Sequence, residues 1–405
     1  MTKIDPALQA QVDAQLLEQG GFAPLELLIN SGRLTYGDYE AWRRGDIESL
    51  DDVLMGSPEK IRAQVETASS YARRIGLVEQ PQEFHSWQTP SPGAAAKLLR
   101  VSADSRLHRL IAIRHVPAQS VPQMDLFFDN PVVALTNGIA RALSARDAAE
   151  AQRQLDRLYA QAPNHADLAA FDQLLTALLS LDQPASDAAA TLSFLQKIAP
   201  NAKRLLGAQS RDLLSPLWNH FAQMLRDQPF LPEHPLLHRS YALGQAHDWA
   251  GVSESVRNEP HWWEHAELCL RLAHSAFYRQ QRLEALTAWC HLCWLHPTQA
   301  DQALGARTQP DGGMVGLWQH FLDSEDDIEL SATDFPAWLL LHEPGLARHL
   351  AEDLPNGRSA GEMQYRCIHR LLQARRDRRK EDELALRRTL QADFPAMFSQ
   401  LKRTV

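Results

Sequence analysis

Alanine and proline recur along this chain at a fixed spacing, and the recurrence limits the fold more than any other feature. An alanine is followed by an apolar residue four positions later, by a second apolar residue three further on, and by proline five after that. The copies run from Ala151 to Pro163, from Ala188 to Pro200 and from Ala285 to Pro297. The first two copies are 37 residues apart. A small residue allows two helices to approach closely, the apolar pair packs on a neighbour, and proline ends a helix. The pattern predicts stacked helical hairpins.

Residues 266–297 carry the most complete copy, and this segment resembles a tetratricopeptide repeat. Its matches to the positions of that family are Leu272, Ala273, Ala276, Ala285, Trp289, Leu292 and Pro297. Gln280 and Gln281 stand where the family has its turn glycine. The resemblance extends over about residues 131–300. It implies a concave surface that binds a peptide or another protein.

We therefore expect an all-α protein, an α-solenoid of tetratricopeptide-like hairpins preceded by a small helical domain and an irregular connector. The predicted divisions are 1–80 for the N-terminal domain, 81–130 for the proline-rich connector, 131–300 for the repeats, and 301–405 for C-terminal hairpins that continue the array. In the connector, residues 97–101 and 110–116 fit two strands of a hairpin or two short helices. Helices are expected to end at Pro163, Pro200, Pro260 and Pro297.

Local signals place two helices in the N-terminal domain. Thr35 and Gly45 are suited to the first and last positions that flank a helix between them. Ser57 followed by Pro58 predicts another helix start, because proline is well tolerated in the first turn. The cluster Tyr36, Tyr39, Trp42, Arg43 and Arg44 lies on the first of these helices, and it fits either a core or an aromatic and arginine surface for a partner.

Composition narrows the class of protein. Glycine is scarce, with 19 residues in 405, and the formal net charge is −9. An acidic chain repels phosphate backbones, which argues against nucleic acid as a partner. Four cysteines do not form a disulfide framework, and there is no apolar leader and no apolar stretch of membrane-spanning length. We expect a cytoplasmic protein that binds no membrane and uses no cofactor.

The segment His261-Trp262-Trp263-Glu264-His265 has the letter pattern of an inverted zinc peptidase motif. On one helix, two histidines four apart share a face, and the glutamate would activate a water molecule. The alternative is that the segment packs at the start of a repeat. We favour packing, because no third ligand is marked in the sequence.

Two further groups invite a chemical interpretation. Cys290 and Cys293, with His296 close by and Cys269 and Cys367 elsewhere, could ligate zinc, but they lie within an apolar helix and are better explained as core residues. The basic run 375–380 could contact phosphate or an acidic partner, or could simply be solvated at a helix end.

No phosphate-binding glycine loop, no nucleophile elbow and no dinucleotide fingerprint is present. The sequence therefore favours a non-enzymatic interaction scaffold that binds a peptide or helix of another protein. The alternatives are a zinc-dependent hydrolase using His261, Glu264 and His265, and a helical-repeat protein that binds nucleic acid. The candidate partner-binding residues are Trp218, His220, Trp262, Trp263, His274, Tyr278, Trp318, Arg375, Arg376 and Arg379.

Overall fold

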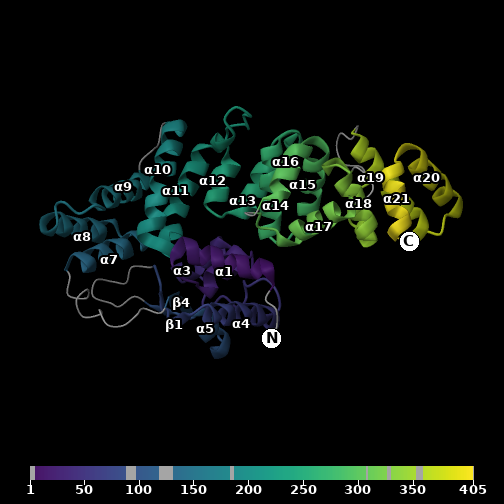
Figure 1. The fold of residues 1–405 in the computed structure, drawn as a ribbon. Coiled ribbons are helices and arrows are strands. Elements are labelled where there is room, and N and C mark those ends of the chain that lie inside the picture. Colours follow the sequence, from purple (N-terminus) through teal and green to yellow (C-terminus); the bar gives the residue numbers. More distant parts are fainter. Residues whose placement is uncertain are drawn as a thin grey trace. The chain divides into compact units, whose positions relative to one another are not determined.

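The chain folds into helices joined by short connections (Figure 1). The structure, a computed structural model, describes residues 5–87, 97–117, 131–182, 187–306, 309–325, 330–352 and 359–404. Over these ranges helices predominate and strands are few and short, which confirms the all-α class. Two compact units are present, Met1–Val252 and Ser253–Val405, and the boundary between them falls inside helix α13.

The first unit opens with a domain of helices and short strands. Its helices are α1 (Pro6–Gln19), α2 (Pro24–Asn30), α3 (Tyr36–Arg44), α4 (Pro58–Arg74) and α5 (Ser105–Ile111), and its strands are β1 (Leu77–Pro81), β2 (Phe84–His85), β3 (Leu98–Leu99) and β4 (Ile113–Pro117). The rest of the unit contains α7 (Pro131–Ser144), α8 (Ala148–Gln161), α9 (Leu168–Leu179), α10 (Ala188–Leu206), α11 (Ser210–Met224), α12 (Arg239–Gln245) and α13 (Trp249–Arg257).

The predicted ends of α3 and α4 are confirmed. The Thr35 side chain accepts a hydrogen bond from the backbone N–H of Asp38, and Gly45 closes the helix with φ 85°. The Ser57 side chain accepts from the backbone N–H of Lys60, with Pro58 in the first turn. These ends depend only on adjacent residues, because each cap satisfies backbone groups that the helix itself leaves free.

Short strands occur in and just before the stretch predicted as a connector, since β1 begins at Leu77. β1 pairs antiparallel with β4, and β2 pairs antiparallel with β3. The segments 97–101 and 110–116 each contain strand residues, but they pair with other strands and do not form a hairpin with one another. Residues 88–96 and 118–130 of the predicted connector lie outside the described residues.

The opening domain has its own apolar core. One cluster of buried side chains brings together α2, α3, α4 and α5 around Trp42, which is fully buried. A second joins α1 to α4 through Val12, Phe22, Leu27 and Ala68. Both clusters consist only of residues from this domain, so it has an apolar core of its own.

The second unit is helical throughout its described residues. Its helices after α13 are α14 (Ala266–Tyr278), α15 (Arg282–Leu295), α16 (Pro297–Gly305), α17 (Gly312–Leu322), α18 (Phe335–His342), α19 (Ala360–Arg376), α20 (Lys380–Asp393) and α21 (Pro395–Thr404). Successive helices pack on one another, and α14 and α15 are drawn side by side in green in Figure 1. The same holds for α19 with α20, and for α7 with α8 in the first unit.

Three of the four predicted helix ends are confirmed. α8, α13 and α15 each end within three residues before Pro163, Pro260 and Pro297. The prediction for Pro200 is wrong, since α10 continues through it to Leu206. Proline removes one backbone hydrogen bond, but the buried side chains of α10 continue on both sides of Pro200. Packing of that apolar face keeps the helix intact.

Four turns between consecutive helices share one backbone geometry. In each, a residue other than glycine takes the left-handed conformation, and φ lies between 55° and 65°. The next residue donates its N–H to a carbonyl five positions earlier, as Asp147 does to Ala142 and Gln281 to Ala276. This is the Schellman arrangement, in which glycine usually occupies the left-handed position. The four left-handed residues are Arg146, His247, Gln280 and Arg378.

Candidate functional site

A cavity of about 360 Å³ lies within the second unit, at the turn between α14 and α15. We call it the hairpin cavity. Its wall is completed by the start of α17 and by Glu343, which follows α18. The lining residues are Phe277, Gln280, Gln281, Arg282, Ala285, Leu286, Asp311, Gly313, Met314, Leu317 and Glu343.

The hairpin cavity combines an apolar surface with a polar edge. Ala285, Leu286 and Met314 are nearly fully buried and supply apolar wall. At the edge, Arg282 reaches both carboxylate oxygens of Glu343 at 2.7 Å. Both contacts come from one guanidinium nitrogen, Nη2, and they join the start of α15 to the residue that follows α18.

Local sequence explains two of the polar residues. Asp311 precedes α17 and accepts a hydrogen bond from the backbone N–H of Met314 at 2.9 Å, so it caps that helix. Burial raises the pKa of Asp311 above its usual range. Gln280 is the left-handed residue of the α14–α15 turn, with φ 58°. Tetratricopeptide repeats have glycine in this turn, whereas this chain has a side chain there.

None of the ten predicted partner-binding residues lines the hairpin cavity. Trp218 and Trp318 are buried, at 3% and 1% exposure, and pack against the rings of Phe221 and Phe335 respectively. His220 and His274 are half-buried. Tyr278 comes nearest, because its ring packs edge-on against the cavity residue Phe277 at 5.2 Å.

The segment His261–His265 does not form one helix. His261 has a left-handed backbone, Trp262–Glu264 is a single turn of 3₁₀ helix, and His265 is extended before α14. The expectation that both histidines share a helix face is therefore wrong. Trp262 and Trp263 instead pack on His291 of α15, and burial lowers the pKa of His291 to about 4. In the described part of the chain, no three His, Cys, Asp or Glu side chains are grouped as a metal site.

The cysteines lie in apolar surroundings. All four are buried and free. Burial raises the pKa of Cys290 to about 12 and that of Cys293 well above its usual value, so both remain thiols at neutral pH. Thiols held in this way behave as small apolar side chains.

Three arginines of the basic run form ion pairs with neighbouring acids. Arg375 pairs with Glu383 at 2.9 Å, and Arg379 pairs with Asp382 at 3.1 Å. Arg376 lies 3.2 Å from Asp377. The three arginines predicted to bind a partner thus lie around the α19–α20 turn and form ion pairs with acids of the same turn.

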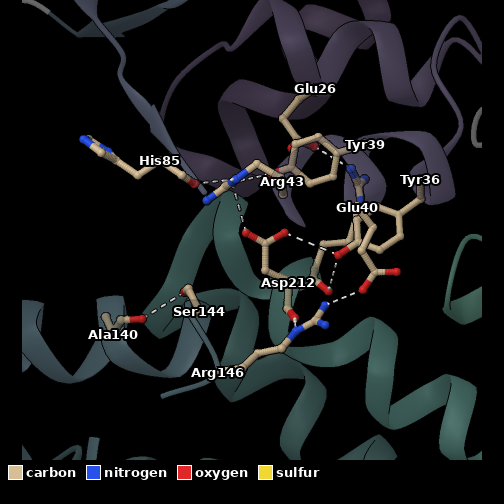
Figure 2. A network of polar contacts seen from close by, with 11 residues as sticks. Glu26, Tyr36, Tyr39, Glu40, Arg43, His85, Ala140, Ser144, Arg146 and Asp212 are labelled. Atoms are coloured by element: carbon tan, nitrogen blue, oxygen red, sulfur yellow. Dashed lines mark hydrogen bonds and ion pairs between the residues drawn. The ribbon is translucent and has the colours of Figure 1, made fainter. Parts of the chain in front are cut away.

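The N-terminal aromatic and arginine cluster lies where the opening domain meets α7 and α11 (Figure 2). Tyr36, Tyr39 and Trp42 are buried, and Trp42 belongs to the domain core. Tyr36 belongs to the same core, and its hydroxyl lies 3.3 Å from the carboxylate of Asp212 in α11. The guanidinium group of Arg43 lies 3.8 Å from the same carboxylate. We call this set the seam cluster: Glu26, Tyr36, Tyr39, Glu40, Arg43, Arg146, Arg211 and Asp212.

Two ion pairs connect the domain to the helices across this seam. Arg211 binds Glu26 at 2.7 Å, and Arg146 binds Glu40 at 2.8 Å. The guanidinium groups of Arg43 and Arg146 both lie 4.7 Å from the ring of Trp87. A ring contacted by two cations adds attraction at a partly buried site.

Asp212 is the most perturbed acid of the seam cluster. Its carboxylate side chain is 5% exposed, and burial raises its pKa to about 7. Burial outweighs the opposing effect of Arg43, Arg146 and Arg211. Sequence reasoning identified Tyr36, Tyr39 and Arg43 but missed Asp212 and its two arginine neighbours, which lie far away along the chain.

The chain shows no significant match to a protein-family model, a curated protein sequence or a solved structure. Among the described helices, none combines the length and the apolar character needed to cross a membrane.

Proposed function

We propose that this protein is a non-enzymatic interaction scaffold, in which tetratricopeptide-like hairpins bind a peptide segment of a partner protein. The observation that carries the proposal is the hairpin cavity. Its volume of about 360 Å³ falls within the range of about 300–1,000 Å³ that is usual for binding pockets. Its apolar wall and charged edge suit an apolar anchor side chain flanked by polar groups.

The recurring turn geometry supports the same function. A left-handed turn at Arg146, His247, Gln280 and Arg378 is what repeated helix pairs would produce. Gln280 links the two features, because it belongs both to a turn of this kind and to the wall of the hairpin cavity. In arrays of helical hairpins, such surfaces between neighbouring helices bind extended or helical peptides.

The proposal predicts that peptides exist whose binding requires the hairpin cavity. A displayed library of random peptides would be selected on the wild-type protein and counter-selected on Leu317→Glu, which places a charge in the half-buried apolar wall. The matched control is Leu283→Glu on α15, because Leu283 is 40% exposed and does not line the cavity.

We expect selected peptides to bind the wild type and Leu283→Glu equally, and to bind Leu317→Glu about tenfold or more weakly, as measured by fluorescence polarisation. Failure to enrich any peptide that distinguishes Leu317→Glu from Leu283→Glu would refute the proposal. Circular dichroism of both variants would show that they remain folded.

A further inference from the structure

A second cavity, of about 220 Å³, lies inside the first unit against the seam cluster. We call it the seam cavity. It is walled by the opening domain on one side and by Leu206, Gln209 and Asp212 at the junction of α10 and α11 on the other. It is smaller than the usual pocket for a drug-sized ligand, so a ligand held there would be small. The proposed peptide-binding function makes no use of it.

Five charged side chains line the seam cavity. Three are acids, Glu26, Glu83 and Asp212, and two are arginines, Arg43 and Arg114. Glu26 is paired with Arg211, and Arg146 lies beside Asp212, so the charges around this wall are close to balanced.

Asp212 lines this cavity without a short hydrogen bond to its carboxylate. Its closest donor is the Tyr36 hydroxyl at 3.3 Å, and Arg43 lies 3.8 Å away, beyond hydrogen-bond range. A buried carboxylate normally accepts several hydrogen bonds, because losing water without replacement is costly.

The arginines around Asp212 are engaged elsewhere. Arg43 donates to the Tyr39 hydroxyl at 2.6 Å. Arg146 donates to the backbone carbonyl of Asp212 and makes no hydrogen bond to the Asp212 carboxylate. Arg211 donates to Glu26 and to Asn30. The carboxylate thus lies among three cations and takes no close hydrogen bond from any of them.

A second acceptor on the same wall also lacks a donor. Gln82 lines the seam cavity, and its side-chain oxygen is buried with no hydrogen-bond partner among the described residues. Buried acceptors of this kind are rare, and each calls for an explanation. Two acceptors on one small cavity both require a group that donates.

We propose that the seam cavity binds a small organic ammonium ion, which donates hydrogen bonds to Asp212 and Gln82. An ammonium group carries three donors and no acceptor, so it can serve both oxygens at once. The ammonium group belongs either to a free amine or to a lysine side chain of a peptide.

The test uses butylammonium, with 1-butanol as the neutral probe of similar size, at matched ionic strength. Isothermal titration calorimetry on the full chain, with up to about 20 mM probe, covers the millimolar affinity expected of a small ligand. We expect saturable binding of butylammonium and none of butanol. Nα-acetyl-lysine amide is the third probe. Equal binding of it would show that the cavity admits a lysine side chain, and its exclusion would restrict the ligand to a free amine.

Two variants locate the site. Asp212→Asn is expected to weaken butylammonium binding about tenfold or more, because it removes the charge and one acceptor. The control Asp46→Asn changes an exposed acid after α3 and is expected to bind as the wild type does. Gln82→Met provides a second site variant if Asp212→Asn does not fold. Equal binding of butanol, the absence of saturable binding, or full affinity in folded Asp212→Asn would each overturn the proposal.

Discussion

Replacing the left-handed arginine of the α19–α20 turn by glycine should stabilise the second unit. Arg378 has φ 57°, is exposed, and makes no side-chain hydrogen bond or ion pair with the described residues. No side-chain interaction of Arg378 with the described residues therefore offsets the strain of its backbone. Arg378→Gly removes the strain and leaves the Schellman hydrogen bonds in place.

The size of the effect follows from two opposing terms. A left-handed conformation costs a residue other than glycine roughly 1–2 kcal/mol. Glycine also lowers stability by about 0.4–1 kcal/mol, because it increases the conformational freedom of the unfolded chain. The net expectation is a stabilisation of about 1 kcal/mol. For a unit of the length of Ser253–Val405, this raises the melting temperature by about 2–4 °C.

The same change at Arg146 should act in the opposite direction. Arg146 has φ 60°, so the backbone gain is similar. Its side chain, however, binds Glu40 and the carbonyl of Asp212, each at 2.8 Å, and contacts Trp87. Charge-assisted hydrogen bonds contribute about 1.5–3 kcal/mol each, and partial exposure reduces this. Arg146→Gly should therefore destabilise the first unit by about 2 kcal/mol.

Urea unfolding followed by hydrogen exchange distinguishes the two units, because peptides from each report their own opening. Arg378→Ala and Arg146→Ala are the matched controls, since they remove the side chain and keep the strained backbone. Arg378→Gly should be more stable than Arg378→Ala. If the two Arg378 variants are equally stable, the strain argument is refuted.

Three further outcomes follow from burial. Because burial raises the folded pKa of Asp212 to about 7 from an ordinary value of 3.8, the contribution of this carboxyl group to the stability of the first unit is fully present below pH 4 and falls by about 4 kcal/mol as the pH rises to 7. Urea titrations of the wild type and of Asp212→Asn should differ by this slope. His291 affects stability in the opposite direction. Its folded pKa is about 4 and its ordinary value is 6.5, so its contribution to stability is lost as the pH falls from 6.5 toward 4. In thermal melts of the second unit, His291→Gln should reduce that loss. Cys290 and Cys293 should resist iodoacetamide at pH 8 until urea unfolds the unit, and rapid native labelling, detected by mass spectrometry, would contradict their burial.

Helix type and helix ends could be predicted because their causes are local. Thr35 and Gly45 act on backbone groups a few residues away, so the short sequence around them contains the information. Pro200 shows where local reasoning fails. Its effect depends on whether the helix face beyond it finds something to pack against, and this is a property of the whole fold.

The seam cluster could not be predicted for a different reason. Arg146 and Glu40 lie 106 residues apart, and Arg211 and Glu26 lie 185 apart. Charged side chains are common at surfaces, so nothing near Arg146 marks it as a partner of α3. The hairpin cavity left a partial signal, because Gln280 departs from the turn glycine of the repeat family. The sequence did not reveal that α17 meets this turn.

The left-handed turns also bear on the order in which the first unit is made. The side chains at two of them reach α3, since Arg146 binds Glu40, and His247 lies 6.2 Å from the ring of Tyr36. A turn between neighbouring helices closes in microseconds, whereas contacts to α3 must bring distant segments together. During synthesis, α3 leaves the ribosome before either turn, in a domain that buries its own core. Each strained turn can therefore close against a surface that has already folded.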